Sequence, residues 1–416
     1  MKASGILALL GAAWAGVVLA ADDPFDRVAD ALAYSGFGDA LRVQVSGTLD
    51  LEGYAFQRPS SDLIYAEDPQ LFNPRLTVFL DAQAGSHWYL FAQARLDRGF
   101  DPANRRAQMR LDEYALRYTP ADDGRFSLQV GKFATVVGNW VPRHLSWENP
   151  FITAPLPYAN LTGIFDAVAA RSAEALLFWA RVAPPRPAPD EYTDPLWRVP
   201  VIWGPSYTAG AAVSGAIGRW DYAVEWKNAS LSSRPYEWDP GRDQWQHPTF
   251  SGRLGYRPDE RWNLGLSAST GTYLQPSAAA TVAPGAGLDD YRETVLGQDL
   301  AFAWHHVQLW AECYEARFAI PLVGNVDTLA YYVEAKYKFT PQFSGAVRWG
   351  QQRFGDVRTR DGRLVPWGSD VWRLEVAPAY RFTAHLEGKL QVSLQHNAVG
   401  RPVYSHLVAA QFVIRF

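Results

Sequence analysis

Apolar and polar residues alternate along most of this chain, and the alternation continues to its last residue. In the final segment, HLVAAQFVIRF (residues 406–416), every second residue from Val408 to Phe416 is apolar, whereas Gln411 and Arg415 lie between them. A period of two is that of an extended strand, whose successive side chains point to opposite faces of a sheet. The sequence therefore predicts an all-β fold whose strands have one apolar and one polar face.

The same alternation returns in many segments upstream, each roughly ten residues long. Short connections such as Gly85-Ser86 and Gly218-Arg219 alternate with long ones such as 138–163. We predict eighteen antiparallel strands, starting near residues 41, 75, 88, 109, 125, 164, 174, 207, 220, 249, 262, 292, 307, 327, 343, 371, 385 and 405. Sixteen strands are the alternative, because Asp166 breaks the alternation in the segment 164–172.

The cost of placing a charge on the apolar faces helps to decide whether these faces contact lipid or a dry protein core. An Arg or Lys on the outer face of a membrane barrel costs about 2–4 kcal/mol at the bilayer midplane, so one face must stay free of charge through the strand centres. Nearly every strand meets this condition. A soluble sandwich would bury the same faces in a dry core and is the competing interpretation. The length of the strands and the aromatic residues at their ends, such as Trp88 and Trp220, favour a transmembrane β-barrel.

Residues 1–20 have the pattern of a secretory signal peptide. Lys2 precedes an apolar stretch, and the small residues Ala20 and Ala21 predict cleavage near one of them. A transmembrane anchor is disfavoured, because the stretch is short and two aspartates follow it. We therefore expect a signal peptide at 1–20, a short periplasmic lead at 21–40 and a single barrel at 41–416.

Composition excludes several classes of function. The formal net charge of −4 gives no basic excess for binding nucleic acid. The only cysteine, Cys313, excludes an internal disulfide framework and a Cys-based zinc cluster. The sequence has no GxSxG, HExxH or CxxCH motif, so we predict no cofactor and no enzymatic activity, with an outer-membrane hydrolase as the disfavoured alternative.

With its signal sequence, its alternating strands and a last strand ending in FVIRF, the chain resembles the Gram-negative outer-membrane porins. The resemblance is architectural and indicates no subfamily. It implies a barrel in contact with outer-membrane lipid, passive diffusion of small hydrophilic solutes or ions through a water-filled pore, and recognition of the C-terminal Phe416 by the barrel-assembly machinery. It leaves open whether the barrel is a monomer or a homotrimer. A carbohydrate-selective porin and a sheath around a partner, such as a multihaem electron-transfer cytochrome, are the alternatives.

The polar faces of the strands predict the lining of the bore, because a barrel of sixteen to eighteen strands encloses water. The predicted lining residues are Arg42, Arg75, Asp81, Arg95, Asp97, Lys227, Glu334, Lys336, Arg348, Arg373, Glu375 and Lys389. A wall whose charges neutralise one another is the simplest interpretation. Transverse charge separation or a mild preference for anions is the more specific one.

The segment GNWVPRHLSWENPFITAPLPYANLTG, 138–163, is the third long loop of the predicted barrel. In porins the corresponding loop folds into the barrel, and the prolines of this segment suit a stiff backbone outside a sheet. We expect Arg143, His144, Glu148, Asn149 and Asn160 to face the passage and set its constriction. The alternative is that the loop caps the barrel from outside.

One strand has a charge on its apolar face. In RFSLQVGKFATV, residues 125–136, the alternation of Leu128 and Val130 would place Lys132 against lipid. We predict a β-bulge at Gly131 that returns Lys132 to the lumen, with snorkelling of Lys132 towards the interface as the alternative.

Overall fold

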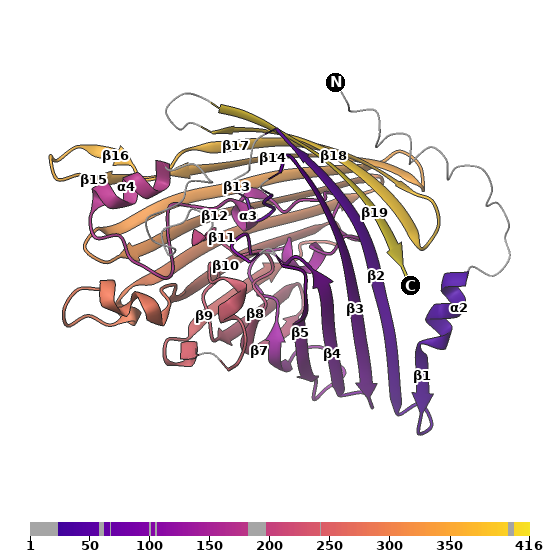
Figure 1. Cartoon of the computed structure of the whole chain (residues 1–416). Helices are drawn as coiled ribbons and strands as arrows, with labels where there is room; N and C mark the ends of the chain where they lie inside the picture. The colour runs from indigo at the N-terminus through magenta and orange to yellow at the C-terminus, as the bar shows by residue number, and fades with distance from the viewer. Residues whose placement is uncertain are drawn as a thin grey trace.

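The computed structural model describes residues 24–57, 62–66, 68–99, 101–104, 106–181, 197–241, 243–397 and 403–416. The predicted signal peptide lies outside these residues. Sixteen strands form a ring in which each strand pairs antiparallel with its neighbours, and the last strand pairs with the first (Figure 1). The fold is therefore an all-β closed barrel.

The strands of the ring follow one another in sequence order. They are β2 (Leu41–Phe56), β3 (Gln70–Ala84), β4 (Trp88–Asp97), β5 (Gln108–Tyr118), β6 (Ser127–Phe133), β7 (Thr208–Ile217), β8 (Trp220–Lys227), β9 (Thr249–Tyr256), β10 (Trp262–Thr272), β11 (Arg292–Trp304), β12 (Val307–Ile320), β13 (Gly324–Lys338), β14 (Phe343–Phe354), β17 (Val371–Arg381), β18 (Leu386–Asn397) and β19 (Val403–Arg415). Short connections join them at one end, which we call the short-turn end. At the other end, the long-loop end, most connections are longer, although β12 and β13 are joined by the three residues 321–323.

Smaller elements lie outside the ring. The helix α2 (Pro24–Ala31) leads into β1 (Ala33–Gly36), which pairs with the first residues of β2 at the short-turn end. The strands β15 (Asp356–Arg358) and β16 (Leu364–Pro366) form a hairpin in the long connection between β14 and β17. No helix among the described residues is long and apolar enough to cross a bilayer.

The count of eighteen strands is wrong, and the alternative of sixteen is right. The strands expected to start near 164 and 174 do not form, because these residues belong to the connection between β6 and β7. We call its described residues, 134–181 and 197–207, the in-folded segment. It contains a 3-10 helix at Val141–Arg143 and the helices α3 (Leu156–Ala159) and α4 (Ala173–Arg181). The sequence AEALLFWAR of α4 is rich in good helix formers, and its buried residues Ala173, Leu176 and Leu177 follow a helical period.

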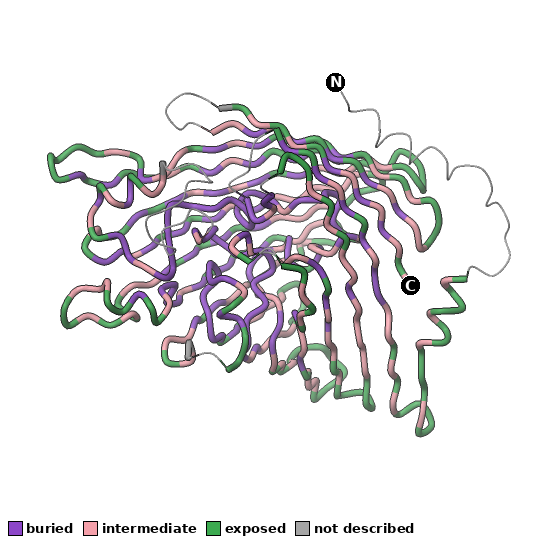
Figure 2. The backbone as a smooth tube through the Cα atoms, in the orientation of Figure 1, coloured by how far each residue is buried: buried purple, intermediate pink, exposed green. Residues whose placement is uncertain are grey.

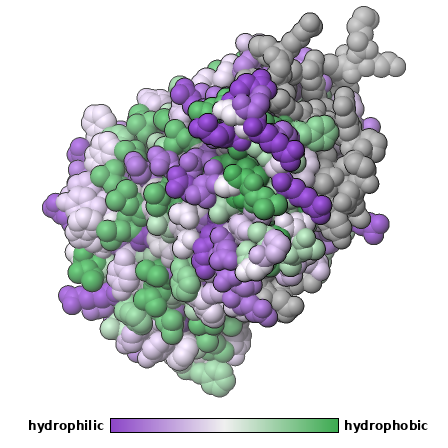
Figure 3. Space-filling view, turned by 90° about the vertical axis from the view of Figure 1, so that its left-hand side faces the viewer, coloured by the Kyte–Doolittle hydropathy of each residue, from purple (hydrophilic) through white to green (hydrophobic). Residues whose placement is uncertain are grey.

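The outer face of the ring is apolar. Buried and exposed residues alternate along the strands (Figure 2), and on β8 and β9 the exposed ones include Val224 and Leu254. Aromatic pairs flank this belt: Trp220 packs on Tyr256 at the short-turn end, and Trp226 on Trp245 at the long-loop end. By contrast, hydrophobic and hydrophilic side chains are interspersed on the face shown in Figure 3, which is the left-hand side of Figure 1, where the long connections lie. An apolar band between two aromatic girdles is the outer surface of a transmembrane barrel.

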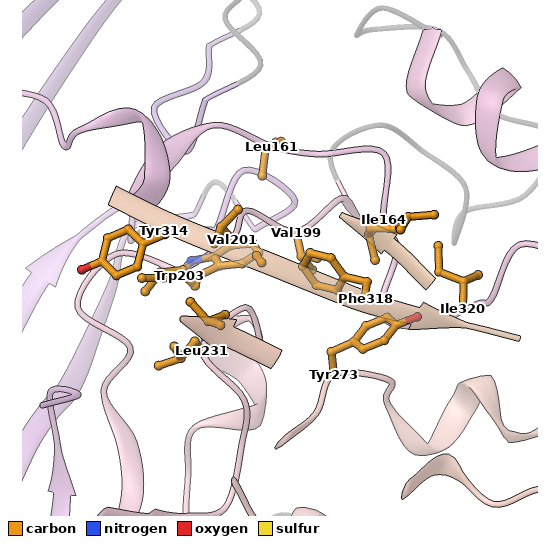
Figure 4. Packing of buried hydrophobic residues seen from close by; sticks show 14 of the residues in the cluster. Leu161, Ile164, Val199, Val201, Trp203, Leu231, Tyr273, Tyr314, Phe318 and Ile320 are labelled. Carbon is orange, nitrogen blue, oxygen red and sulfur yellow. The ribbon is translucent and has the colours of Figure 1, made fainter. Parts of the chain in front are cut away.

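A large apolar cluster lies inside the ring, between the in-folded segment and the inner faces of β11 to β13. Val201 and Trp203 of the segment pack near Tyr314 and Phe318 of β12 (Figure 4), and all four side chains are buried. The expectation of a wide water-filled bore therefore needs correction. This side of the lumen is filled with protein, because most inward positions of these strands near the long-loop end, such as Val295, Phe318 and Val326, are themselves apolar.

The bulge predicted at Gly131 does not form. Lys132 keeps a regular register with Tyr114 of β5, and its ammonium donates to Leu111 O (3.1 Å) and pairs with Asp239 (2.6 Å). The register shift of this region lies instead between β4 and β5, at Gln93/Ala94. The charge is neutralised at the end of its strand by a carboxylate from a neighbouring loop.

The apolar belt predicts the effect of a charge on the outer face. Replacing Leu254 with Arg should destabilise the barrel in lipid by about 2–4 kcal/mol, because Leu254 lies between the two girdles. Reversible unfolding in urea from phospholipid vesicles measures this change. Leu322→Arg is the matched control, since Leu322 is exposed in the loop after β12. Equal stability of the two variants would contradict a hydrocarbon contact at Leu254.

Candidate pore and its in-folded segment

Glu312 on β12 anchors the start of the in-folded segment. Its carboxylate accepts hydrogen bonds from the backbone N–H groups of Asn139 and Trp140, the latter at 2.8 Å, and from Tyr158 Oη at 2.8 Å. Gly138 just before these residues has φ of +78°, and a Cβ there would lie 2.0 Å from Tyr314 Oη. Only glycine therefore lets the chain approach the wall this closely.

A chain of buried charges anchors the middle of the segment. Arg143 donates to Glu334 Oε1 (2.6 Å) and to Tyr332 Oη (3.0 Å). Arg348 bridges Glu334 and Glu375, at 3.4 and 2.5 Å, and also donates to the carbonyl oxygen of Thr153 in the segment (2.9 Å). Buried charges must be paired and hydrogen-bonded, and here the segment supplies part of that pairing.

Three further cations predicted to line the bore hold backbone oxygens. Arg373 donates to Ala154 O (2.6 Å) and pairs with Asp62 of the β2–β3 loop. Lys389 donates to Asn149 O (2.7 Å), and Lys227 donates to the carbonyl oxygens of Phe133 and Thr208, at either end of the segment. These cations fix the course of the segment and are buried.

Free space is found on the opposite side of the lumen, between the in-folded segment and β2 to β4. A cavity of about 110 Å³ is lined there by predicted wall residues, Arg75, Arg95 and Asp97, and by predicted loop residues, His144 and Asn149. A second, more open cavity of about 460 Å³ lies beside it and shares Leu71 and Arg98 with it. We call these two neighbouring cavities together the passage.

Ion pairs line the strand side of the passage. The guanidinium of Arg75 on β3 pairs with Asp50 (3.0 Å) and Glu52 of β2. Asp97 on β4 pairs with Arg110 of β5 (2.6 Å). Ser146 of the in-folded segment donates to Asp50 Oδ1 (2.8 Å), so the segment also contacts this wall.

The other predicted site residues lie elsewhere. Arg143 and Asn160 lie against the wall outside the passage, Asn160 donating to Gln352 Oε1 (2.8 Å), and Glu148 is exposed. Arg42, Asp81 and Lys336 lie on the half of their strands nearest the short-turn end, where each is at least partly exposed. Whether any of these residues limits the flow of solute stays a prediction.

Loop residues of the passage were missed by the sequence analysis. Asp62, Leu63 and Ile64 come from the β2–β3 loop, which folds inward and forms a β-bridge with the in-folded segment at Asn160. Arg98 directly follows β4. The alternation of polar and apolar residues along the strands carries no information on which loops turn inward. Among these missed residues, only Arg98 could have been predicted to lie in the passage, because it directly follows a strand.

His144 is held neutral inside the segment. Its Nδ1 lies 2.5 Å from Val141 O, which can only accept, so Nδ1 carries the proton and Nε2 accepts from Tyr207 Oη. Burial lowers the pKa of His144 to about 3, and the nearby positive charges of Arg95 and Arg75 lower it too.

Acid should therefore loosen the segment. An undocked His144 takes up a proton below its ordinary pKa of 6.5, whereas the docked one does not until about pH 3, so docking stability falls as the pH drops through this window. Hydrogen exchange of residues 138–163 in vesicles should quicken between pH 6.5 and 4. His144→Asn should flatten the dependence and His87→Asn, at an exposed turn, should not. An unchanged profile in His144→Asn would contradict the assignment.

The Glu312 anchor gives a second prediction. Glu312→Ala leaves the backbone N–H groups of Asn139 and Trp140 without an acceptor, at about 1–3 kcal/mol each, whereas Tyr158 Oη keeps Tyr314 Oη as a partner, so the start of the segment should undock. Faster hydrogen exchange at 138–163 and a noisier single-channel current would report this. Glu315→Ala on the same strand is the control, because Glu315 is exposed. Equal exchange in both variants would show that Glu312 is not an anchor.

Comparison with known proteins was made by sequence and by structure. No protein-family model and no curated protein sequence matches the chain. Among solved structures, OmpF of Salmonella typhi in complex with daunomycin has a TM-score of 0.55 at 10% identity, covering 92% of this chain and 100% of that one. The outer membrane channel DcaP of Acinetobacter baumannii has a TM-score of 0.55 at 9% identity, with coverages of 92% and 100%. OmpT of Vibrio cholerae in its trimer form has a TM-score of 0.54 at 8% identity, with coverages of 91% and 100%. The chain has the fold of the Gram-negative outer-membrane β-barrel porins.

Proposed function

We propose that the protein is an outer-membrane channel through which small hydrophilic solutes or ions diffuse passively. The observation that carries the proposal is the pair of neighbouring cavities between β2 to β4 and the in-folded segment, walled on one side by charged residues. In the membrane the long-loop end faces the exterior and the short-turn end the periplasm, as in bacterial barrels generally. Solute then moves along the passage rather than through the centre of the ring.

Because part of the lumen is filled with protein, a narrow channel is better supported than a sheath around a partner or a carbohydrate path. A sheath around a folded partner such as a cytochrome needs an open centre, whereas the apolar cluster occupies the lumen beside β11 to β13. A carbohydrate path needs accessible rings. Arg143 covers the ring of Trp310 at 4.3 Å, and Tyr314 and Tyr332 are buried. The passage suits solutes of a few heavy atoms across.

Assembly and oligomeric state belong to the same proposal. The C-terminal Phe416 exchanges backbone hydrogen bonds with Gly47 of β2, at 2.9 and 3.0 Å, so it lies at the seam that closes the ring. We take it as the residue that the barrel-assembly machinery reads. A homotrimer is the assembly to test first, since OmpT of Vibrio cholerae has a trimer form; the mass of the native complex in detergent decides it.

Site-directed labelling tests the passage. In a Cys313→Ala background, Leu145→Cys carries a thiol in the cavity wall, and coupling a bulky methanethiosulfonate reagent should lower the single-channel conductance severalfold, because the narrow part is then obstructed. Leu322→Cys, in the exposed loop after β12, is the matched control and should conduct as before labelling. A labelled Leu145→Cys channel with unchanged conductance would place the solute path elsewhere.

A further inference from the structure

A group of cations lies inside the ring at the short-turn end, outside the passage. We call it the basic cluster, and its members are Lys336 and Lys338 of β13, Arg381 of β17, Lys389 of β18 and Arg415 of β19. Lys336 interacts electrostatically with the other members on β13, β17 and β18. Trp147 of the in-folded segment links Arg415 to them, because the guanidinium carbons of Arg381 and Arg415 lie 4.7 and 5.6 Å from the centre of its ring. None of these described residues lines either cavity of the passage.

One buried carboxylate is shared between two members of the cluster. Glu387 of β18 pairs with Arg381 at 3.0 Å and with Lys389 at 3.4 Å. Lys336 interacts with Glu387 electrostatically, but neither Lys336 nor Lys338 forms an ion pair within the part of the chain that the structure describes. A single carboxylate therefore serves four cations.

The other carboxylates near the cluster leave a positive excess. Glu148 of the in-folded segment is exposed and interacts with Lys389. The C-terminal carboxylate of Phe416 directly follows Arg415. Asp50 also acts on Lys389, but an arginine of the passage wall already pairs with it. Together with the shared carboxylate of β18, these groups amount to three available carboxylates against the five cations of the cluster.

The cations without a partner are accessible from the short-turn end. Lys338 is exposed and Lys336 is half-buried. The side chain of Arg381 is 41% exposed, against 9% for that of its partner Glu387. An ion that enters from this end therefore meets the cations before it meets the carboxylate.

The wall between the two outer lysines has room for a ligand. One line of the strand register consists of Lys338, Ser344, Ala379 and Lys389. The two residues between the lysines are small, and both are partly exposed. Phe151 of the in-folded segment packs on the next inward residue of β14, an alanine, and closes the site towards the long-loop end. The site is therefore open only towards the short-turn end.

We propose that the basic cluster binds a multivalent oxyanion of the phosphate type at the periplasmic mouth of the barrel. The planar guanidinium of Arg381 suits two phosphate oxygens, and the ammonium groups of Lys336 and Lys338 supply point charges for the others. The hydroxyl of Ser344 is a further donor. A monovalent ion such as chloride contacts fewer of these groups at once. The site is separate from the passage, so the inference does not depend on the proposed channel function.

Binding of inorganic pyrophosphate and of inorganic phosphate to the folded protein in detergent tests the proposal. Isothermal titration calorimetry in a buffer of low ionic strength measures this binding, since salt screens exposed charges. We expect one pyrophosphate to bind per chain. Pyrophosphate should bind more tightly than phosphate, because it carries more negative charge and more oxygens.

Two double variants that remove the same charge separate a local site from the overall field of this end. Lys336→Gln with Lys338→Gln should weaken pyrophosphate binding by about tenfold or more, because two charged contacts to the anion are lost. Arg219→Gln with Arg261→Gln removes two exposed arginines from other turns at the same end and should change the affinity by less than about twofold. Neither lysine has a carboxylate partner among the described residues, so their replacement leaves no buried charge unpaired.

A change of opposite sign gives an independent test. Glu148→Gln removes a carboxylate near the cluster and should strengthen pyrophosphate binding severalfold. Because Glu148 is exposed, this variant keeps the buried contacts of the in-folded segment and decides the question even where the lysine variant does not fold. The heat-dependent mobility of each variant in electrophoresis shows whether it is folded.

The outcomes bear on this site and not on conduction. Absence of pyrophosphate binding by the native protein overturns the proposal. An equal loss of affinity in the two double variants overturns it as well, since only the overall charge of this end would then attract anions. Unchanged affinity in Glu148→Gln would place the bound anion elsewhere. Conductance in a planar bilayer, or its absence, tests the channel function alone.

Discussion

Closure of the hydrogen-bonded ring is the constraint on which the rest of the structure depends. In hydrocarbon a backbone N–H or C=O without a partner costs several kcal/mol, so the edge of an open sheet cannot face lipid. The pairing of β19 with β2, from Leu407↔Phe56 to Arg415↔Thr48, removes both edges. Because the ring is closed, every strand has an inner and an outer face. The outer face is apolar, whereas the inner face carries the charged residues that contact the in-folded segment.

The inner face of this barrel holds a folded segment as well as lining the passage. Charged residues of the inner face, which in a water-filled barrel would face solvent, instead hold the in-folded segment. Glu312, Glu334, Arg348, Arg373 and Lys389 all bind it directly or through one another. Burying these charges is tolerated because each is bonded, and the segment gains a defined course without strands of its own. The lumen is divided as a result. One side is a packed interior, and the other is the passage.

Strand alternation predicted the barrel because it reports directly on the two faces. Leu266 and Ser267, for example, are adjacent on β10, and one is exposed on the outer face while the other is buried inside. The same pattern failed for residues 164–181. The apolar residues of α4 (Ala173–Arg181) have a helical spacing that a search for strands misreads, and residues 164–172 form only an isolated bridge, between Phe165 and Arg198. The sequence indicates part of the filling of the lumen, because Phe318, Val326 and Ala330 are apolar residues at positions whose side chains face inward. Which residues surround the passage could not be predicted, because loops such as that of Asp62 are placed by contacts with distant residues.

The in-folded segment joins the fifth strand of the ring to the sixth, yet it is bonded to β14, β17 and β18, which come near the end of the chain. These late strands complete the interior only when they take their places beside it. We therefore expect pairing of the late strands and docking of the in-folded segment to be coupled. A barrel whose ring closes without the segment would leave Arg348, Arg373 and Lys389 without the backbone oxygens of Thr153, Ala154 and Asn149, so the free energy of closing the ring depends on the docked segment.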